Sequence, residues 1–192
     1  MDIKIKKFDG MVLPESAYDS DTGYDVIAMS DPIIIGVRAA EGVDCWKRVD
    51  YIEYDTGICI APEDGLVKTI DNGHIKVWTQ KHNSIGYTLL FPRSSLSKYN
   101  LQMCGSLGLI DNSYRNSIKA RFRYIWQPED FIYFNQSDGV VSYGRINLDK
   151  IYKKGDRLAQ LVAMWKEDIQ WKIVDSLDET PRNTDGFGSS GN

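Results

Sequence analysis

The sequence predicts an all-β fold, a distorted jelly roll or β-barrel. Apolar residues alternate with polar ones in several short runs, and no 3.6-residue apolar repeat extends over the length of a helix. Turn sequences such as Asp71-Asn72-Gly73 and Ser137-Asp138-Gly139 separate these runs. Asn-Gly and Asp-Gly are typical of tight hairpins, because they supply the positive φ angles that such turns require. Many short strands joined in this way are typical of sandwiches, jelly rolls and barrels.

The clearest strand covers residues 118–126. Its apolar positions are Ile118, Ala120, Phe122, Tyr124 and Trp126, and three of the four residues between them are basic. This period of two predicts a strand with one buried face. The polar turn before it would hold Asp111 and Tyr114 at the rim of a sheet.

The other strands are expected in chain order near residues 3–5, 26–28, 33–35, 58–60, 66–70, 74–78, 87–91, 131–134, 140–143 and 157–165, with a last alternation at Ile169, Trp171 and Ile173. The run 157–165 is nearly all apolar, which predicts a strand buried on both faces. Residues 31–56 have a poor pattern and are expected to form an elaborated loop or an extra hairpin packed on the barrel. A short helical turn is expected after Arg93, capped by Ser94 or Ser95.

Composition limits the possible functions. The 192 residues suit one domain, and 42% of them are hydrophobic, which is ordinary for a protein with a real core. A net charge of −4 argues against a broad nucleic-acid-binding face. The three cysteines form no CxxC pair, and the two histidines have no metal-ligand spacing with them. Free thiols, with no signal peptide and no apolar run long enough for a membrane, predict a cytoplasmic protein, or one inside a host cell if the chain is viral.

Two carboxylates are candidates for chemistry. Asp111 lies in the turn before the clearest strand, with Tyr114 three residues later. An acid and an aromatic residue held there suit a site, although an acid in a turn is usually a turn former. Asp25 follows a glycine turn, and it is equally consistent with a carboxylate near a site and with a partner of backbone amides.

Two further stretches suit anions. Arg93, Ser94 and Ser95 place a cation and two hydroxyl groups beside a possible helix start, where free backbone amides attract anions; an ordinary helix cap is the alternative. The C-terminal stretch 186–191 has the composition of loops that wrap phosphates with backbone amides, but it lacks the Gly-Lys-Ser/Thr of a P-loop. Phe187, between two glycines, would gain by stacking on a flat ligand.

Taken in order, five motifs resemble those of the homotrimeric dUTP pyrophosphatase (dUTPase) family. They are TGYDV at Thr22–Val26, PRSSL at Pro92–Leu96, GLIDNSYR at Gly108–Arg115, GDRLAQL at Gly155–Leu161 and RNTDGFGSSG at Arg182–Gly191. The resemblance implies a jelly-roll trimer whose active sites are each built from three subunits. It also implies hydrolysis of dUTP to dUMP and pyrophosphate by attack of water on the α-phosphorus.

The resemblance assigns roles to individual residues. Asp111 would deprotonate the attacking water, which Gln160 helps to hold, and Arg93 would be the third catalytic residue. The remaining residues would bind substrate: Ser94 and Ser95 the phosphates, Gly108, Leu109 and Ile110 the uracil edge, Tyr114 the deoxyribose, Arg182 the γ-phosphate, and Phe187, Gly188 and Ser189 the bound nucleotide as the tail closes. Phe187 would stack on uracil. Asp25 would contact the residues that bind substrate and would not touch the substrate itself. Mg²⁺ would bind mainly to the phosphates and water.

The implied organisation is one barrel domain over residues 1–181, with insertions near 31–56 and 126–152. Residues 182–192 would form a flexible arm that closes over a neighbouring subunit's site. The insertions are expected to extend the trimer surface or to bind a protein partner. The chain departs from the family pattern at Ser95, at Asn116-Ser117 and at Asn183-Thr184-Asp185. Asp185 would put a negative charge near the phosphates.

Two alternatives remain open. The RSSL wording of the second motif also resembles the related dCTP deaminases, but that reaction needs a glutamate base in the pocket, and the third motif presents Asp111. The other alternative is a nucleotide-gated interaction or regulatory protein that uses its insertions. Neither alternative requires a membrane or a nucleic acid as partner.

Overall fold

A computed structural model describes residues 2–6, 9–62, 68–71, 74–77, 85–166 and 169–181. In these residues the regular elements are strands and three short 3-10 helices, so the predicted all-β fold is confirmed. The strands are β1 (Ile3–Ile5), β2 (Tyr24–Ile27), β3 (Ile33–Arg38), β4 (Trp46–Asp55), β5 (Ile60–Pro62), β6 (Lys68–Asp71), β7 (His74–Val77), β8 (Ile85–Pro92), β9 (Leu101–Met103), β10 (Gly108–Ile110), β11 (Lys119–Tyr124), β12 (Phe131–Gln136), β13 (Gly139–Gly144) and β14 (Arg157–Lys166). The helices are η1 (Ser94–Lys98), η2 (Pro128–Asp130) and η3 (Leu148–Lys150).

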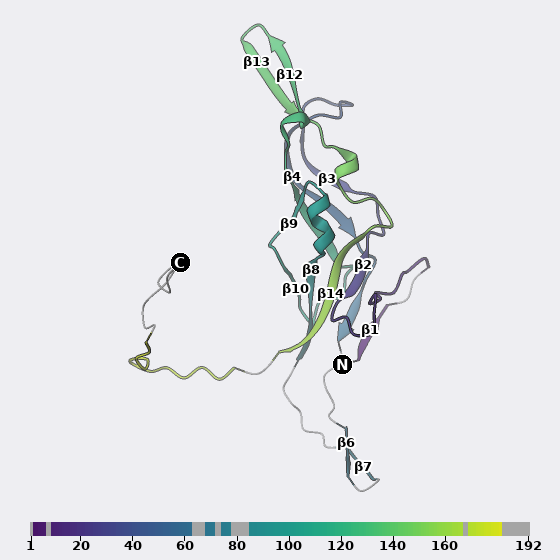
Figure 1. Cartoon of the computed structure of the whole chain (residues 1–192), viewed down its shortest axis with the longest axis vertical. Coiled ribbons are helices and arrows are strands. Elements are labelled where there is room, and N and C mark those ends of the chain that lie inside the picture. Colours follow the sequence, from purple (N-terminus) through teal and green to yellow (C-terminus); the bar gives the residue numbers. More distant parts are fainter. Residues whose placement is uncertain are drawn as a thin grey trace.

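Two antiparallel sheets form the body (Figure 1). One has the strand order β10-β8-β14-β2; the other has the order β12-β13-β4-β11-β9, with β3 also paired to β4. Two small antiparallel pairs, β1-β5 and β6-β7, complete the described strands. Strand β14 pairs with β2 and with β8, both far away in sequence, and this pairing brings separate motifs together in one sheet.

Both sheets contribute to a single hydrophobic core. The alternation predicted for residues 118–126 is confirmed, because the burial of β11 alternates residue by residue, with Ala120, Phe122 and Tyr124 buried. Phe122 and Tyr54 of β4 pack edge-to-face at 5.8 Å between ring centroids. The Tyr54 hydroxyl donates to the Tyr152 carbonyl at 2.9 Å, so the polar atom of this large buried ring has a partner.

The region 31–56 contains the extra hairpin, as β3 and β4. Its second strand enters the core, where Ile52 and Tyr54 are fully buried, and it pairs with β11. The hairpin around Ser137-Asp138-Gly139 is also present, as β12 and β13, and it projects from one end of the body (Figure 1). The Asn72-Gly73 turn lies outside the described residues, although β6 and β7 pair on either side of it. That these insertions bind a partner stays a prediction.

Two local expectations were wrong. Strand β14 is buried only in its first half: it lies between β2 and β8 there, but beyond Leu161 it pairs with β8 alone, and Met164 and Trp165 are exposed. Neither Ser94 nor Ser95 caps η1. The N-cap residue is Arg93, and no side chain bonds to the first turn, because a guanidinium has only donors and cannot accept from the backbone amides there.

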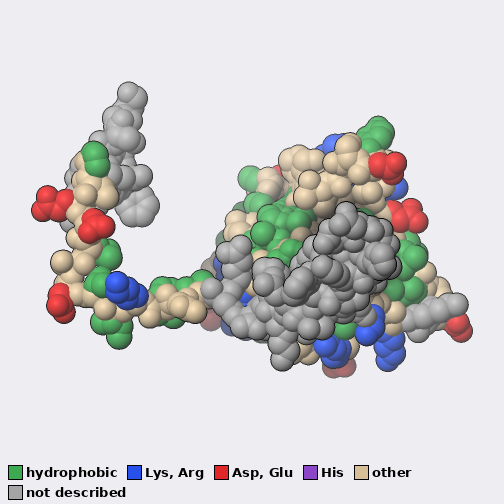
Figure 2. All heavy atoms as spheres, turned by 90° about the horizontal axis from the view of Figure 1, so that it is seen from below, with side chains coloured by type: hydrophobic (Ala, Val, Ile, Leu, Met, Phe, Trp, Pro, Cys, Tyr) green, Lys and Arg blue, Asp and Glu red, His purple; other side chains and the backbone are tan. Residues whose placement is uncertain are grey.

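Residues 169–181 leave the body as an extended segment (Figures 1 and 2). The predicted alternation at Ile169, Trp171 and Ile173 forms no strand in the described chain, and these side chains are 66%, 87% and 98% exposed. The cysteines Cys45, Cys59 and Cys104 are free. Within the described residues no helix is long and apolar enough to cross a membrane.

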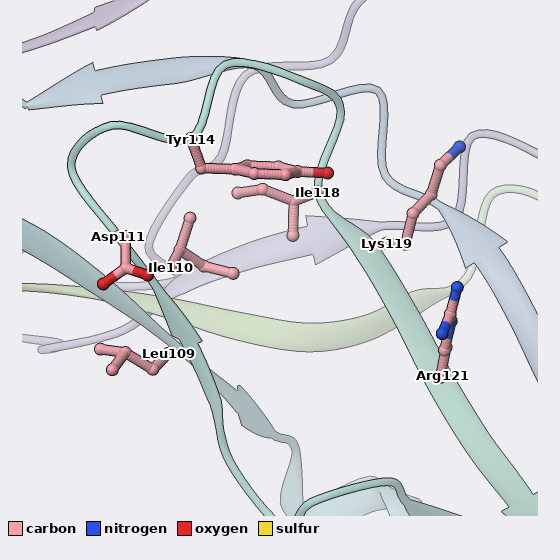
Figure 3. A pocket seen from close by; sticks show the side chains of 7 residues that line it. All are labelled: Leu109, Ile110, Asp111, Tyr114, Ile118, Lys119 and Arg121. Carbon is pink, nitrogen blue, oxygen red and sulfur yellow. The ribbon is translucent and has the colours of Figure 1, made fainter.

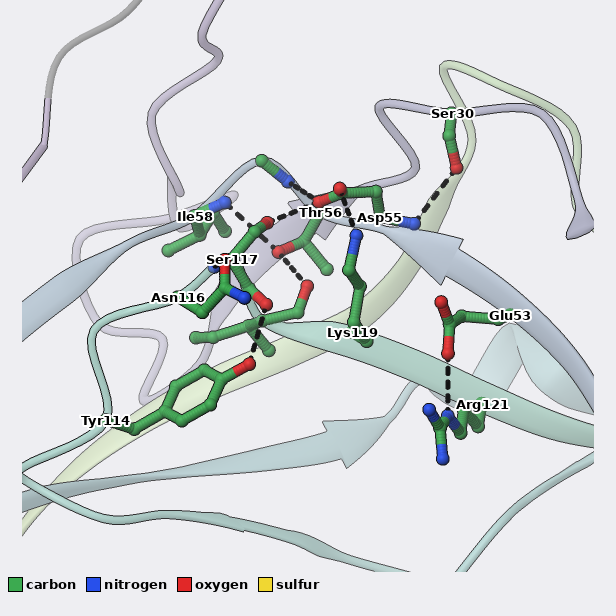
Figure 4. Close-up of polar contacts among 12 residues, drawn as sticks. Ser30, Glu53, Asp55, Thr56, Ile58, Tyr114, Asn116, Ser117, Lys119 and Arg121 are labelled. Carbon is green, nitrogen blue, oxygen red and sulfur yellow. Dashed lines mark hydrogen bonds and ion pairs between the residues drawn. The ribbon is translucent and has the colours of Figure 1, made fainter.

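The two sheets leave a pocket of about 360 Å³ at one rim, between β10 and β11 (Figure 3). Beside it, β4 and β11 are tied together through one carboxylate (Figure 4). Asp55 accepts hydrogen bonds from the Ser117 hydroxyl, the Lys119 ammonium and the Gly57 amide. Lys119 lies directly opposite Asp55 in the ladder, so the ion pair reinforces the strand pairing.

The Asp55 contacts predict a pH-dependent stability. Partial burial alone would raise the pKa of the Asp55 carboxyl, but hydrogen bonds from Lys119, Ser117 and Gly57 outweigh it and lower the pKa below its ordinary value of 3.8. A lowered folded-state pKa means that the stabilisation is present above the unfolded-state pKa and is lost as the pH falls through the folded-state value. The melting temperature of Asp55→Asn should therefore be lower than wild type at neutral pH, and the difference should shrink from about pH 5 downwards.

Calorimetric melts over this pH range measure the effect. Asp50→Asn is the matched control, because Asp50 lies on the same strand but makes an exposed ion pair with Arg48. A difference between wild type and Asp55→Asn that stays constant with pH would contradict the assigned contacts.

Candidate active site

The structure brings the predicted site residues together in two separate groups. One group contains Asp25, Arg93 and Gln160 from three motifs, together with Arg157, and is called the arginine cluster below. The other surrounds the pocket between β10 and β11 and contains Leu109, Ile110, Asp111 and Tyr114. Arg182, Phe187, Gly188 and Ser189 lie outside the described residues, so their roles stay predictions.

The arginine cluster is centred on the Asp25 carboxylate, which is only 8% exposed. Its Oδ1 lies 3.0 Å from Arg93 Nε and accepts from Gln160 Nε2 at 3.4 Å, while Oδ2 lies 3.2 Å from Arg157 Nη1. Sheet register produces this meeting: Gln160 lies opposite Asp25, and the neighbouring Ala159 lies opposite Pro92, which precedes Arg93. Asp25 thus contacts three polar side chains: that of Arg93, which follows β8, and those of Arg157 and Gln160, which are both on β14.

The charges of this cluster favour an anion. Two guanidinium groups share one buried carboxylate, which leaves a net charge of about +1 at the start of η1, where Ser94 and Ser95 follow Arg93. Because a guanidinium keeps its charge and has five N–H donors, Arg93 retains donors beyond the one directed at Asp25. The arrangement suits a phosphate group.

The pocket is built on a turn between β10 and β11. The Tyr114 amide donates to the Asp111 carbonyl at 3.0 Å, which closes the turn. The Tyr114 ring lies over Ile110 and Ile118, and Asp111 lies at the other side of the pocket mouth (Figure 3). Asn112 holds the turn to the sheet, since its Nδ2 donates to the carbonyl oxygens of Pro62 at 3.1 Å and Gly86 at 2.9 Å.

Strand β10 lies at the edge of its sheet, and its residues Leu109 and Ile110 line the pocket. In the described sheet β10 pairs with β8 on one side only, so the outward N–H and C=O groups of Gly108–Ile110 are not used by the ladder. An edge of this kind can bind the donor and acceptor pattern of a flat base. A Cβ atom on Gly108 would lie 3.3 Å from Leu90 Cβ, which is tighter than ordinary contact.

Within one chain the two groups stand at opposite ends of β8. Ile110 is paired with Thr88, so Asp111 follows at the level of the early part of β8, whereas Ser94 comes after the last residue of β8. Six residues separate Thr88 from Ser94, which at the rise of an extended strand is roughly 20 Å. No single phosphate chain attached to a base in the pocket reaches both groups at once in one chain.

Four residues that belong to the candidate site were not predicted from the sequence. Arg157 and Asn112 lie inside the fourth and third motifs, and only the strand register shows that they bond to Asp25 and to β8. Lys119 and Arg121 line the pocket and were seen only as the polar face of β11. Their alternation with buried residues predicts that they lie on a polar face of the strand, but it does not predict that this face adjoins a pocket.

The chain offers no protein metal cage in the part that is described. No group of three or more His, Cys, Asp or Glu side chains there could hold an ion, and the Asp25 carboxylate is already occupied by two arginines. A divalent ion at this site would therefore need most of its oxygen ligands from a bound phosphate chain and water.

Comparisons with known proteins identify the family of the chain. The family model for dUTPase matches residues 135–191. A deoxyuridine 5′-triphosphate nucleotidohydrolase from Rickettsia conorii is 30% identical over 193 residues, covering 98% of this chain and 96% of the relative. The corresponding protein of Rickettsia bellii is 31% identical, covering 98% and 95%.

The fold is also that of solved dUTPases. A dUTPase of Staphylococcus bacteriophage 80alpha with dUPNHPP has a TM-score of 0.61 at 20% identity, covering 99% of this chain and 98% of that chain. A mutant dUTPase from phage phi11 of S. aureus, in which a structural Mg(II) ion is coordinated, has a TM-score of 0.54 at 17% identity, covering 92% and 98%. Because the Rickettsia relatives match over almost the whole length of both chains, this chain belongs to the dUTPase family.

Proposed function

We propose that Asp111 is the general base with which this dUTPase hydrolyses dUTP to dUMP and pyrophosphate. Its carboxylate is exposed at the pocket mouth, on a turn that Asn112 fixes to β8. A positioned base of this kind contributes about 10²–10⁴-fold by taking the proton of water as it attacks the α-phosphorus. Gln160, whose amide is oriented by Asp25, helps to hold that water.

The arginine cluster binds the triphosphate in this proposal. A unit-charge pair about 4 Å apart is worth about 4 kcal/mol at an effective dielectric constant of 20, so a few fixed cations outweigh the net negative charge of the whole protein locally. Arg93 is held by Asp25 at 3.0 Å before substrate arrives. This preorganisation means that little side-chain entropy is lost on binding. Ser94 and Ser95 then donate to phosphate oxygens.

The pocket selects a deoxyuridine nucleotide. The free backbone groups of Gly108, Leu109 and Ile110 pair with the uracil edge, and cytosine presents mismatched donors to them. The Tyr114 ring, which lines the pocket, packs against the sugar in this proposal and leaves no room for a 2′-hydroxyl. From residues 182–192, Arg182 reaches the γ-phosphate, while Gly188 and Ser189 close over the nucleotide and Phe187 stacks on uracil.

Each complete site combines residues from different copies of the chain. The observation that supports this most strongly is the separation of roughly 20 Å between Asp111 and Ser94 along β8. A rotationally symmetric ring, here a trimer, brings the pocket of one copy to the arginine cluster of the next and repeats the same contact around the axis.

Mg²⁺ is the metal of this family, and it fits this site only through the substrate. The described residues contain no ligand cage, so the phosphates and water hold the ion and no side chain of those residues is assigned to it. When bound, the ion supplies charge neutralisation of the phosphates. Arg93 and Arg157 supply the remaining positive charge on the protein side.

The first prediction concerns the base. Asp111→Asn should keep the turn, because the turn bond to Tyr114 uses the Asp111 carbonyl, but it should lower kcat for dUTP by about 10²-fold or more. The Kd for a non-hydrolysable dUTP analogue should change little. Steady-state kinetics and calorimetric titration measure the two quantities. An unchanged kcat would refute the assigned role.

The second prediction concerns the shared site. Asp111→Asn and Arg93→Ala should each be nearly inactive, and co-refolding equal amounts should restore activity to about one quarter of wild type. One site in four would then receive an intact Asp111 from one copy and an intact Arg93 from the next. Each variant is first checked for its oligomeric state. Mixed trimers that stay inactive would show that both residues act within one chain.

A further inference from the structure

A network of hydrogen bonds behind the pocket ends on the Tyr114 side chain (Figure 4). The Tyr114 hydroxyl donates to the Ser117 carbonyl at 3.0 Å. The Ser117 hydroxyl in turn donates to the Asp55 carboxylate. Tyr114 is 41% exposed and lies in a loop without regular structure, so this chain of contacts is what fixes the far end of its ring.

We propose that Asp55 is a positioning residue for Tyr114, acting through Ser117, and that it thereby sets how strongly the enzyme rejects a ribose nucleotide. The inference rests on the proposed function, in which the Tyr114 ring occupies the space of a 2′-hydroxyl. Asp55 itself touches no substrate. It lies on β4, behind the segment that carries the ring.

The segment around Ser117 is held by more contacts than strand pairing requires. Thr56 donates to the Ile118 carbonyl through both its hydroxyl, at 2.7 Å, and its amide, at 3.1 Å. The Ile118 amide donates to the Ile58 carbonyl at 2.9 Å. The turn at residues 55–58 is thus hydrogen-bonded to Ile118, just before β11 begins. These bonds fix the direction of the neighbouring Ser117 carbonyl, which accepts from Tyr114.

Hydrogen bonds also fix the position of the Asp55 carboxylate. The Gly57 amide donates to its Oδ1 at 2.8 Å, and the Asp55 amide donates to the Ser30 hydroxyl at 3.0 Å. Lys119 pairs with the other carboxylate oxygen. With both oxygens engaged, the carboxylate cannot rotate freely, and it holds the Ser117 hydroxyl in one place.

The bond to Ser117 is not needed for the ladder itself. Glu53 and Arg121 form a comparable ion pair between the same strands at 2.7 Å, and that pair makes no bond to the Tyr114 loop. Ser117 lies before the first residue of β11, outside the ladder. A role in placing Tyr114 accounts for the additional bond.

The test compares kcat/KM for dUTP and for UTP. Removing one hydrogen bond of this kind costs about two- to tenfold. Ser117→Ala, Asp55→Asn and Tyr114→Phe should each lower the dUTP/UTP ratio of kcat/KM by that factor. Ser117→Thr, which keeps a hydroxyl group, should restore the ratio to near wild type. In the double variant Tyr114→Phe with Asp55→Asn the losses should not add, because both changes break one chain of contacts.

Asp50→Asn is the control, since Asp50 is on the same strand but bonds only to Arg48 in an exposed pair. It should leave the ratio unchanged. The inference would be overturned if Asp55→Asn kept the wild-type ratio, for example by lowering kcat/KM for dUTP and for UTP equally. A purely structural role would lower both values by the same factor. A Tyr114→Phe variant that discriminates as wild type does would also overturn the inference.

Different results would overturn the role of Tyr114 and the role of Asp55. A wild-type enzyme that hydrolyses UTP as readily as dUTP would overturn the sugar-excluding role of Tyr114, and the inference with it. A different result would overturn the inference alone. In that case Tyr114→Phe lowers the dUTP/UTP ratio of kcat/KM, whereas Ser117→Ala and Asp55→Asn keep the wild-type ratio.

Discussion

Strand β8 imposes the constraint on which the arrangement of the site depends. It pairs with β10 near one end and with β14 along its length, so it places the free edge of β10 and the arginine cluster in one sheet but roughly 20 Å apart. Each half is complete by itself: Asp25 orients Arg93 and Gln160, and Asn112 fixes the Asp111 turn. Because of the distance between them, we propose that the site is completed by a second copy of the chain.

Much of the fold was predictable because alternation reports burial directly. The period of two over residues 118–126 predicted β11 and its buried face, and the Asp-Gly turn predicted the hairpin of β12 and β13. Strand β14 shows the limit of such reasoning. Its apolar composition predicts burial on both sides, but its outer half has only β8 as a neighbour, and no local pattern states how many partners a strand has.

Sequence motifs name candidate site residues only where the chemistry is local. Asp111, Tyr114 and Arg93 stand in short motifs, whereas the contacts that fix them come from residues distant in sequence. Asp25 and Gln160 meet only through the register of β2 and β14, and Asp55 reaches Ser117 across 62 positions. The departure at Asn116-Ser117 also becomes understandable: Ser117 is bonded on one side to Asp55, and its amide donates to Asn116 Oδ1 at 2.8 Å.

The central claim is that the pocket of one copy works with the arginine cluster of another. The most direct measurement is a crystal structure of the assembled protein with a non-hydrolysable dUTP analogue. We expect one ligand to contact Tyr114 and Asp111 of one subunit and Ser94 and Arg93 of its neighbour. A ligand whose base and phosphates are both bound by the same chain would contradict the account.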